Sequence, residues 1–291
     1  MILNEKKIQI ERIKKLKINN KEIKNYKLKD LYNLPIFSGV ISLKFNNEFF
    51  YMLNINNDDG VVLKYLWRDY YEPLSLKLWY VLTRQDGYFV DIGAHTGIYT
   101  IVANINKKEN NVISLEPFFI NFSRMASNMR LNNITTNNCF LSALSNVEGI
   151  DKMQINTGNF YHSSGGKISI NGNLQIQKKI LDNFNFPKPL KLMKIDTEGH
   201  EHKVLLGAKN IIKKYLPNII FEINENSFMK SMNFLNEFKY HFYFLDENIN
   251  KITKIQEFNK NLIKEEGSNC FATNSNLHES NNIFKKLNLL Q

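Results

Sequence analysis

The sequence predicts an α/β protein whose parallel sheet is covered by helices on both faces. Three observations support this fold class. From residue 87 onward, short apolar runs alternate with helix-like segments, which is typical of consecutive βαβ units. The apolar runs are nearly continuous, which indicates strands buried on both faces. A glycine-containing loop at residues 91–97 follows the first run, where such folds approach a ligand.

The N-terminal part precedes this alternation. Residues 1 to about 35 are rich in lysine with isoleucine intermixed and predict a partly amphipathic helix. Residues 40–53 predict a β-hairpin that turns at Asn46-Asn47. We therefore expect an extension over residues 1–66 and a main domain over residues 67–291, which begins with a helix over 74–82.

The main domain predicts alternating elements. Strands are expected at 88–92, 112–115, 138–141, 192–195, 219–223, 240–245 and 270–273, the last two forming an antiparallel edge. Helices are expected at 98–105, 118–131 and 201–216. The segment 149–189 interrupts the alternation, and its glycine-rich middle, 157–166, predicts a lid over a substrate. Tyr161 and His162 are the residues there best suited to contact a sugar, by stacking and by hydrogen bonding.

Composition limits the class of partner. The formal net charge is +10, with 38 Lys and Arg against 28 Asp and Glu, but the lysines are scattered along the whole chain. This argues against a nucleic-acid-binding face. Only Cys139 and Cys270 are present, which suits a reducing compartment. The N-terminus has no secretory pattern, and no apolar run approaches the ~20 residues that span a bilayer. We expect a soluble, cytoplasmic protein.

The loop Asp91-Ile92-Gly93-Ala94-His95-Thr96-Gly97 is the first chemical signal. Loops that bind NAD place glycine where Asp91 stands, because a carboxylate there would repel the pyrophosphate. A carboxylate suits a ligand with a cationic amine, such as S-adenosylmethionine. We assign Asp91, Gly93, Ala94 and Gly97 to cofactor binding.

The ends of the next two strands extend this site. Glu116 follows the second strand and is expected to accept hydrogen bonds from both ribose hydroxyls, although Glu116-Pro117 also fits a helix entry. Ser142 and Ala143 end the third strand, where small groups face an adenine. With Glu72 and Pro117, they complete the expected cofactor set.

The fourth strand ends in Lys194-Ile195-Asp196-Thr197-Glu198-Gly199-His200-Glu201. We expect Asp196, which also belongs to the cofactor set, Glu198 and His200 to be catalytic, with His200 the preferred base. The alternative is that this element only caps the following helix. A divalent metal such as Mg²⁺, held by Asp196 and Glu222 with Asn224 beside them, is a further alternative, and we do not predict it.

Together these motifs resemble the FkbM family of S-adenosylmethionine-dependent methyltransferases over about residues 70 to 275. His95 departs from the asparagine that is common in the family. The resemblance implies a Rossmann-like, seven-stranded methyltransferase sheet and methyl transfer to a hydroxyl. The matching residues are Tyr71-Glu72-Pro73, the 91–97 loop, Glu116-Pro117, Asn128, Asn132-Asn133, Ser142-Ala143-Leu144, the 194–201 element, Leu205-Leu206-Gly207-Ala208 and Pro217-Asn218-Ile219-Ile220-Phe221-Glu222.

The leading functional hypothesis is an O-methyltransferase that acts on a sugar hydroxyl in a glycan or polysaccharide pathway. The alternatives are a methyltransferase of a non-sugar small molecule or of nucleic acid, and a non-catalytic glycan-binding module. Sensitivity to a chelator would favour the metal mechanism, and failure to bind S-adenosylmethionine would favour the binding module. The acceptor, the hydroxyl position, the metal dependence and the oligomeric state are not determined by the sequence.

Overall fold

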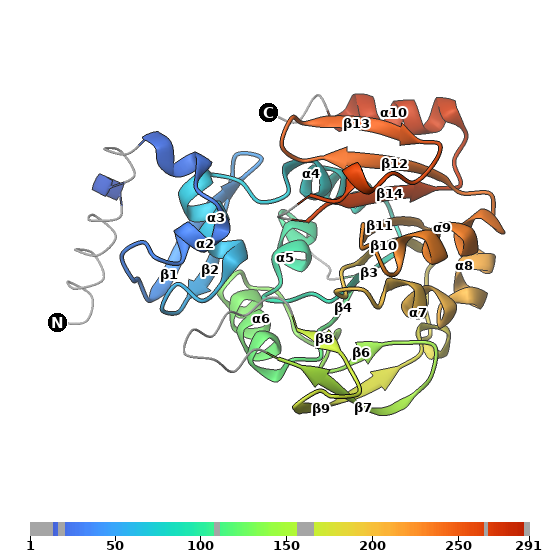
Figure 1. Ribbon diagram of the computed structural model, residues 1–291, viewed down its shortest axis with the longest axis horizontal. Helices are drawn as coiled ribbons and strands as arrows, with labels where there is room; N and C mark the ends of the chain where they lie inside the picture. Colours follow the sequence, from blue (N-terminus) through green and yellow to red (C-terminus); the bar gives the residue numbers. More distant parts are fainter. Residues whose placement is uncertain (1–13, 17–20, 108–110, 156–165, 265–266, 288–291) are drawn as a thin grey trace.

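A computed structural model describes residues 14–16, 21–107, 111–155, 166–264 and 267–287 of the chain. Its main feature is a mixed sheet of eight strands in the order β13-β12-β14-β11-β10-β3-β4-β5 (Figure 1). The strands are β3 (Tyr88–Ile92), β4 (Val112–Leu115), β5 (Cys139–Phe140), β10 (Leu190–Ile195), β11 (Asn218–Glu222), β12 (His241–Asp246), β13 (Lys251–Ile255) and β14 (Asn269–Thr273).

The sheet is built outward from its middle. β4 and β5 extend it on one side of β3, β10 and β11 extend it on the other, and all of these strands are parallel. The strand order therefore reverses between β3 and β10, and ligands of such sheets bind at this switch point, beyond the carboxyl ends of the strands. β14 runs antiparallel to β11, and β12 runs antiparallel to β14. The predicted Rossmann-like methyltransferase fold is confirmed.

β13 is an eighth strand that the sequence did not predict. It pairs antiparallel with β12 at the edge of the sheet. Lys251, Thr253 and Lys254 are exposed on it. Because an edge strand has a neighbour on one side only and is protected by lysines, it lacks the apolar run that indicated the other strands.

Consecutive strand residues point to opposite faces of the sheet, and each face has its own apolar cluster. One cluster combines strand residues with helices α4 (Pro73–Leu82), α5 (Ile98–Asn104) and α10 (Leu277–Leu287); its strand residues include Phe89, Val112, Leu192 and Ile220. The other combines strand residues with α7 (Glu201–Leu206), α8 (Lys209–Tyr215) and α9 (Phe228–Asn236); its strand residues include Val90, Ile113, Met193 and Ile219. Helices therefore cover both faces, as predicted.

The single helix predicted for 201–216 is two helices, α7 and α8. A Cβ at Gly207 would lie 2.0 Å from the carbonyl oxygen of Ser145, so the chain passes this point too closely for a longer side chain. The Asp182 carboxylate accepts hydrogen bonds from the backbone N–H groups of Asn210 and Ile211 at 3.0 and 2.9 Å. The close approach of Ser145 thus accompanies the end of α7, and the Asp182 carboxylate caps the start of α8.

The predicted hairpin is confirmed as β1 (Gly39–Phe45) and β2 (Glu48–Asn54). Asn46 and Asn47 have φ values of +47° and +65°, which asparagine tolerates in the two-residue turns of hairpins. The short helices η1 (Lys21–Asn25) and α2 (Leu28–Leu31), followed by α3 (Gly60–Arg68), complete the described N-terminal part.

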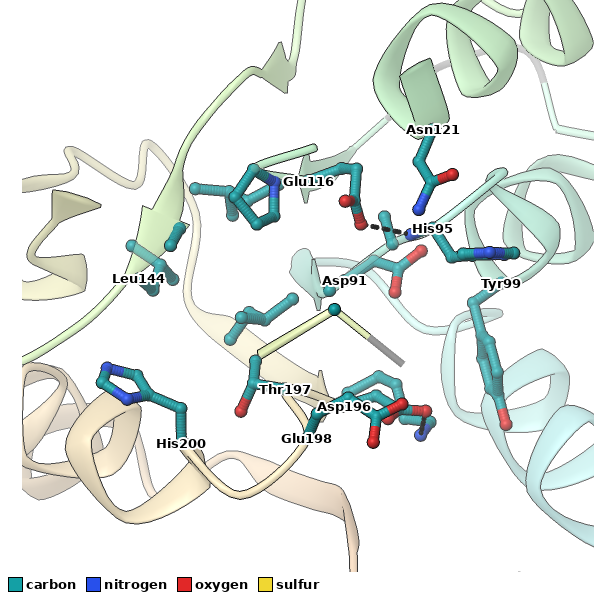
Figure 2. A pocket seen from close by; sticks show the side chains of 18 of the residues that line it. Asp91, His95, Tyr99, Glu116, Asn121, Leu144, Asp196, Thr197, Glu198 and His200 are labelled. Carbon is teal, nitrogen blue, oxygen red and sulfur yellow. Dashed lines mark hydrogen bonds and ion pairs between the residues drawn. The ribbon is translucent and has the colours of Figure 1, made fainter. Parts of the chain in front are cut away.

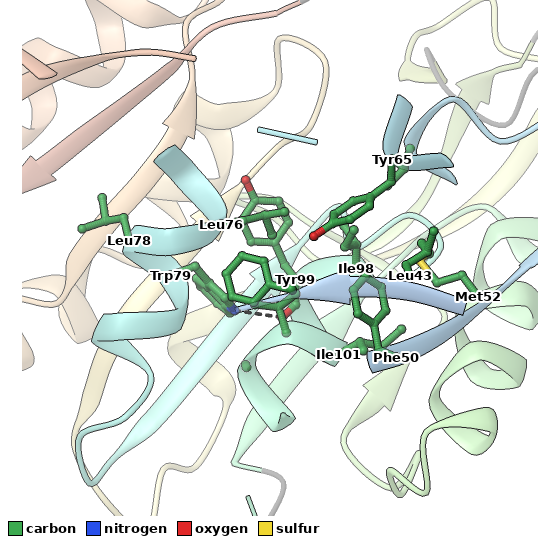
Figure 3. Close-up of a cluster of buried hydrophobic side chains, with 14 of the residues drawn as sticks. Leu43, Phe50, Met52, Tyr65, Leu76, Leu78, Trp79, Ile98, Tyr99 and Ile101 are labelled. Atoms are coloured by element: carbon green, nitrogen blue, oxygen red, sulfur yellow. Dashed lines mark hydrogen bonds between the residues drawn. The ribbon is translucent and has the colours of Figure 1, made fainter. Parts of the chain in front are cut away.

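The N-terminal elements share a core with the main domain. Figure 3 shows Leu43, Phe50 and Met52 of the hairpin beside Ile98 and Ile101 of α5, and all five belong to one buried cluster. The boundary at residue 66 stays a prediction, and α3 continues across it.

The predicted interruption after residue 149 contains most of a second, four-stranded sheet. Its order is β6-β9-β7-β8, with β6 (Ala143–Leu144), β7 (Gly149–Gln154), β8 (Lys167–Ile168) and β9 (Leu174–Lys179). Helix α6 (Phe119–Leu131) and the 3-10 turns η2 (Leu181–Asn183) and η3 (Lys260–Leu262) complete the described elements. Residues 156–165, and with them Tyr161 and His162, lie outside the described residues.

Asp59 caps α3, since its Oδ1 accepts hydrogen bonds from the backbone N–H groups of Val61 and Val62 at 2.9 and 3.2 Å. We expect Asp59→Ala to lower the free energy of unfolding by about 1–2 kcal/mol in urea denaturation, and Asp59→Asn to cost less because it keeps an acceptor oxygen. The control is Asp86→Ala, an exposed surface aspartate, which should change stability by less than about 0.5 kcal/mol. An Asp59→Ala variant as stable as the wild type would show that the cap is unimportant.

Candidate active site

Two adjoining cavities lie at the carboxyl ends of the central strands. The first cavity is lined by the segments that follow β3, β4 and β10 and by β6. The second cavity is lined by α2, α3 and the ends of β10, β11 and β14. Val61, Tyr71, Asp196 and Glu198 line both cavities. The two cavities therefore meet at the switch point of the sheet.

Asp91 lies near the carboxyl end of β3 and lines the first cavity (Figure 2). The residue is only 1% exposed, and its Oδ2 accepts a hydrogen bond from Thr100 Oγ1 at 2.7 Å. Burial raises the pKa of Asp91 to about 6, and the bond from Thr100 opposes that rise. Above that pH the carboxylate presents a buried negative charge to the cavity.

Both glycines of the 91–97 loop have a positive φ, and each lies too close to a neighbouring residue to carry a side chain. Gly93 has a φ of +75°, and a Cβ there would lie 1.8 Å from the carbonyl oxygen of Asp196. Gly97 has a φ of +94° and faces α6, where a Cβ would lie 2.8 Å from Met125 Cγ. Gly93 and Ala94 are among the described residues that line the first cavity, and Gly97 is not.

Glu116 forms part of the wall of the first cavity with Pro117. Its Oε2 accepts a hydrogen bond from the backbone N–H of His95 at 2.9 Å, drawn in Figure 2, and its Oε1 accepts one from the N–H of Phe118 at 2.9 Å. Burial raises the pKa of Glu116. The backbone and the Asn121 side chain thus fix the orientation of the carboxyl, which keeps lone pairs for a ligand hydroxyl.

Ser142 and Ala143 line the same cavity. The Oγ atom of Ser142 is buried and has no hydrogen-bond partner among the described residues. Because buried hydroxyls in proteins are nearly always paired, this atom indicates a position for a ligand group.

The loop after β10 carries the three residues predicted to be catalytic, and all of them line the first cavity. Figure 2 shows the carboxylates of Asp196 and Glu198 together on one side of this loop, while the ring of His200 points the other way, toward Leu144. The sequence suggested that the three side chains converge, and in this structure they do not.

His200 has its own partner. Its Nε2 lies 2.9 Å from Ser145 Oγ. Burial, followed by the charges of Lys178 and Lys203, lowers the pKa of His200 to about 4. The ring is therefore neutral at physiological pH and is a weak base.

Glu201 organises this loop. Its Oε1 accepts hydrogen bonds from the N–H and Oγ1 of Thr197 at 3.1 and 3.0 Å and from the N–H of Gly199 at 3.0 Å, and Ser227 Oγ donates to its Oε2. The residue is fully buried. This carboxylate, for which the sequence suggested only an interaction with the helix dipole, holds the segment that carries Asp196 and Glu198.

Lys194 is a buried cation that lines the first cavity. Its Nζ donates to Asp196 Oδ2 at 3.0 Å and to Asn269 Oδ1 at 3.1 Å. Burial alone would lower the pKa of Lys194, but Asp196 and Glu72 raise it above its usual range. The lysine therefore stays charged and forms an ion pair with Asp196.

Glu72 lines the second cavity but is not among the described residues of the first. It adopts a left-handed conformation with φ +39° and accepts a hydrogen bond from the Tyr99 hydroxyl. Tyr99 in turn lines the first cavity. Any effect of Glu72 on a ligand there is therefore indirect.

Residues that the sequence did not single out for the site are Tyr71, Lys194 and Tyr99, and it weighed Glu222 only as a metal ligand. Glu222 lines the second cavity. In the sequence, its position at the end of a strand was the only indication that Glu222 belongs to the site. Within the described ranges, no group of three or more His, Cys, Asp or Glu side chains could hold a metal ion. Of the helices described, none has the length and apolar character needed to cross a bilayer.

Comparison with known proteins identifies the family of the chain. The family model "Methyltransferase FkbM domain" matches residues 91–248, which is more than half of the 291 residues. No curated protein matches the chain.

Several solved structures are similar to the chain. A methyltransferase FkbM from Methylobacillus flagellatus is 13% identical with a TM-score of 0.42, over 73% of this chain and 53% of that one, so the chain spans about half of its length. An O-methyltransferase from Bacillus cereus in complex with S-adenosylhomocysteine is 12% identical with a TM-score of 0.38, over 69% and 80%. An S-adenosylmethionine-dependent O-methyltransferase from Thermotoga maritima is 10% identical with a TM-score of 0.39, over 70% and 65%.

Proposed function

Because the chain belongs to the FkbM family of S-adenosylmethionine-dependent methyltransferases, we propose that it methylates a sugar hydroxyl in a glycan or polysaccharide pathway. The observation that carries this proposal is the pair of adjoining cavities. One has the acids and the close backbone approach that suit the cofactor, and the other is rich in carboxylates and suits a polyhydroxylated acceptor.

The first cavity fits S-adenosylmethionine. Asp91 would pair with the amino group of the methionine part, beside the backbone of Gly93 and Ala94. Glu116 would accept hydrogen bonds from the ribose hydroxyls through its remaining lone pairs. The unpartnered hydroxyl of Ser142 supports an adenine position there, against Ala143 and Pro117.

Two residues of the expected cofactor set would act indirectly. Gly97 allows α5 to begin against Met125 of α6. Glu72 accepts the hydrogen bond of Tyr99, and Tyr99 borders the cofactor cavity.

When bound, the cofactor supplies an electrophilic methyl group on a sulfonium centre. The protein must hold the acceptor oxygen in line with that methyl group and remove the hydroxyl proton. Asp196 and Glu198 border both cavities and are our candidates for holding the hydroxyl, with Asp196 held in place by Lys194. The bond to Ser145 and the low pKa of His200 favour a positioning role for this histidine over that of the base.

A sugar suits the second cavity because carboxylates accept hydrogen bonds from hydroxyls. Its lining includes the acids Glu72, Asp196, Glu198 and Glu222 and the aromatic ring of Tyr71. That Tyr161 and His162 contact the acceptor stays a proposal from the sequence.

We also propose that the protein acts in the cytoplasm, since both of its cysteines are free thiols and Cys270 is buried.

Deletion of the gene should remove one O-methyl group from a surface glycan of the source organism. Mass spectrometry of the released glycans would show a loss of one methylene mass, and complementation with the wild-type gene should restore it. Polysaccharide from the deletion strain, which would lack the methyl group, is then the acceptor for assays in vitro. Identical glycan spectra with and without the gene would contradict the sugar assignment.

A further inference from the structure

We propose that Glu222 is the general base of the reaction, accepting the proton of the acceptor hydroxyl in the second cavity. This inference rests on the proposed function and adds to it a catalytic residue. Glu222 ends β11, and the neighbouring parallel strand β10 leads directly into Asp196.

The register of the two strands brings the acids together. Ile195 of β10 is paired with Phe221 of β11, so the next residues, Asp196 and Glu222, emerge side by side at the carboxyl edge of the sheet. Both line the second cavity, and Asp196 also lines the first. A hydroxyl next to these two carboxyls lies at the junction of the cavities, where its oxygen can meet the methyl group.

Glu222 differs from the neighbouring acids in its partners. Asp196 accepts a hydrogen bond from Lys194, and Glu72 accepts one from Tyr99. The Oε2 atom of Glu222, in contrast, is buried and has no hydrogen-bond partner among the described residues. Burying an acceptor oxygen without a donor is unfavourable, so a ligand hydroxyl that donates to it is favoured.

The electrostatic environment supports a base at this position. Burial and neighbouring negative charges raise the pKa of Glu222 to about 9, so the free protein holds this carboxyl protonated at neutral pH. The sulfonium charge of the bound cofactor should lower this pKa, and the ionised carboxylate is then a stronger proton acceptor than one of ordinary pKa. The charged groups that act on it from the sheet side are Asp196, Glu198, Glu201 and Lys194. Those that line the second cavity from the other elements are Lys27, Lys29, Lys64 and Glu72.

The step balances without a further reactant. The acceptor oxygen forms a bond to the methyl carbon while the carbon–sulfur bond breaks and leaves its electron pair on sulfur. The hydroxyl proton passes to Glu222. The neighbouring Asp196, paired with Lys194, raises the pKa of Glu222 and so favours this proton transfer.

The first test needs no acceptor. Calorimetry of S-adenosylmethionine and S-adenosylhomocysteine binding, in buffers of different ionisation enthalpy between pH 7 and 9, counts the protons released. The sulfonium charge should lower the pKa of Glu222, so S-adenosylmethionine should release more protons than the neutral thioether. Asp91 faces the amino group common to both ligands, so its contribution cancels in the difference. Glu222→Gln should abolish this difference.

The matched control is Glu225→Gln, three residues further along, whose exposed carboxylate pairs with Lys260. It should keep the wild-type proton count. On polysaccharide from the deletion strain, Glu222→Gln should lower kcat by ~10²–10⁴-fold with little change in cofactor affinity or acceptor KM. The wild-type rate should rise with pH to an inflection at or below about 9, and the variant should lack it.

The outcomes separate the two proposals. If the wild-type protein does not bind S-adenosylmethionine, the proposed function fails. If it binds, and Glu222→Gln leaves kcat, the pH profile and the proton difference unchanged, the inference fails and the proposed function stands. If Glu222→Gln does not fold, Glu222→Asp is tested in its place. A wild-type protein that releases the same number of protons on binding either ligand overturns the inference.

Discussion

Asp91→Ala should weaken S-adenosylmethionine binding by at least ~100-fold in calorimetry, equivalent to about 2.7 kcal/mol. The buried carboxylate would be lost from the cavity wall, and no other acid in the 91–97 loop would replace it. Affinity of the wild type should also fall as the pH drops below about 6, because protonation of Asp91 removes the same charge. NAD should not bind measurably to either protein.

Two observations distinguish a loss of cofactor binding from a loss of folding in the Asp91 variants. Thr100 Oγ1, which donates to Asp91, also lies 2.6 Å from Ser114 Oγ, so it keeps a partner in the variant. Asp91→Asn keeps the shape and removes only the charge, and it should also bind weakly. Asp86→Ala, at an exposed site, is the control and should bind normally. Wild-type affinity in both Asp91 variants would refute the cofactor assignment.

Asp196→Asn should lower turnover by ~10²–10⁴-fold, whereas His200→Ala should lower it by less than ~10-fold. The asparagine keeps an oxygen for Lys194 but loses the negative charge at the junction of the cavities. His200 is neutral, points away from that junction and is bonded to Ser145. The assay measures methyl transfer to polysaccharide from the deletion strain.

Cofactor affinity separates this effect from simple damage to the site. His200→Ala should bind S-adenosylmethionine within a few-fold of the wild type, and Asp196→Asn should lose much less cofactor affinity than turnover. His202→Ala, a histidine that is not among the described residues lining either cavity, is the matched control. The opposite pattern, with His200→Ala inactive and Asp196→Asn active, would restore the histidine as the base and contradict our assignment.

The central part of the fold could be predicted because its signals are local. The strands at β3, β4, β10 and β11 are buried on both faces and therefore appear as continuous apolar runs. β13 gave no such signal, because Lys251, Thr253 and Lys254 are exposed and interrupt its two isoleucines. The break between α7 and α8 was missed because it depends on Ser145 and Asp182, which lie far away in the sequence.

The candidate site could likewise be predicted from the sequence only in part. The positions of Asp91, Glu116 and Asp196 at strand ends were evident from the sequence, because the carboxyl ends of parallel strands lie at one edge. The separation of His200 from Asp196 was not evident, since it depends on how the loop after β10 turns around Glu201.

The acids at the ends of β3, β4 and β10 could be assigned from the sequence, and with them the cofactor class and the resemblance to the family. Which of these residues share a cavity, and which have partners, depends on the tertiary structure. Glu222 and Asp196 are 26 residues apart (222 − 196), yet the register of β10 against β11 sets them side by side. The physical reason is that apolar periodicity and turn chemistry act between near neighbours in the chain. Burial, pKa and hydrogen-bond satisfaction depend instead on elements brought together by the strand order of the sheet.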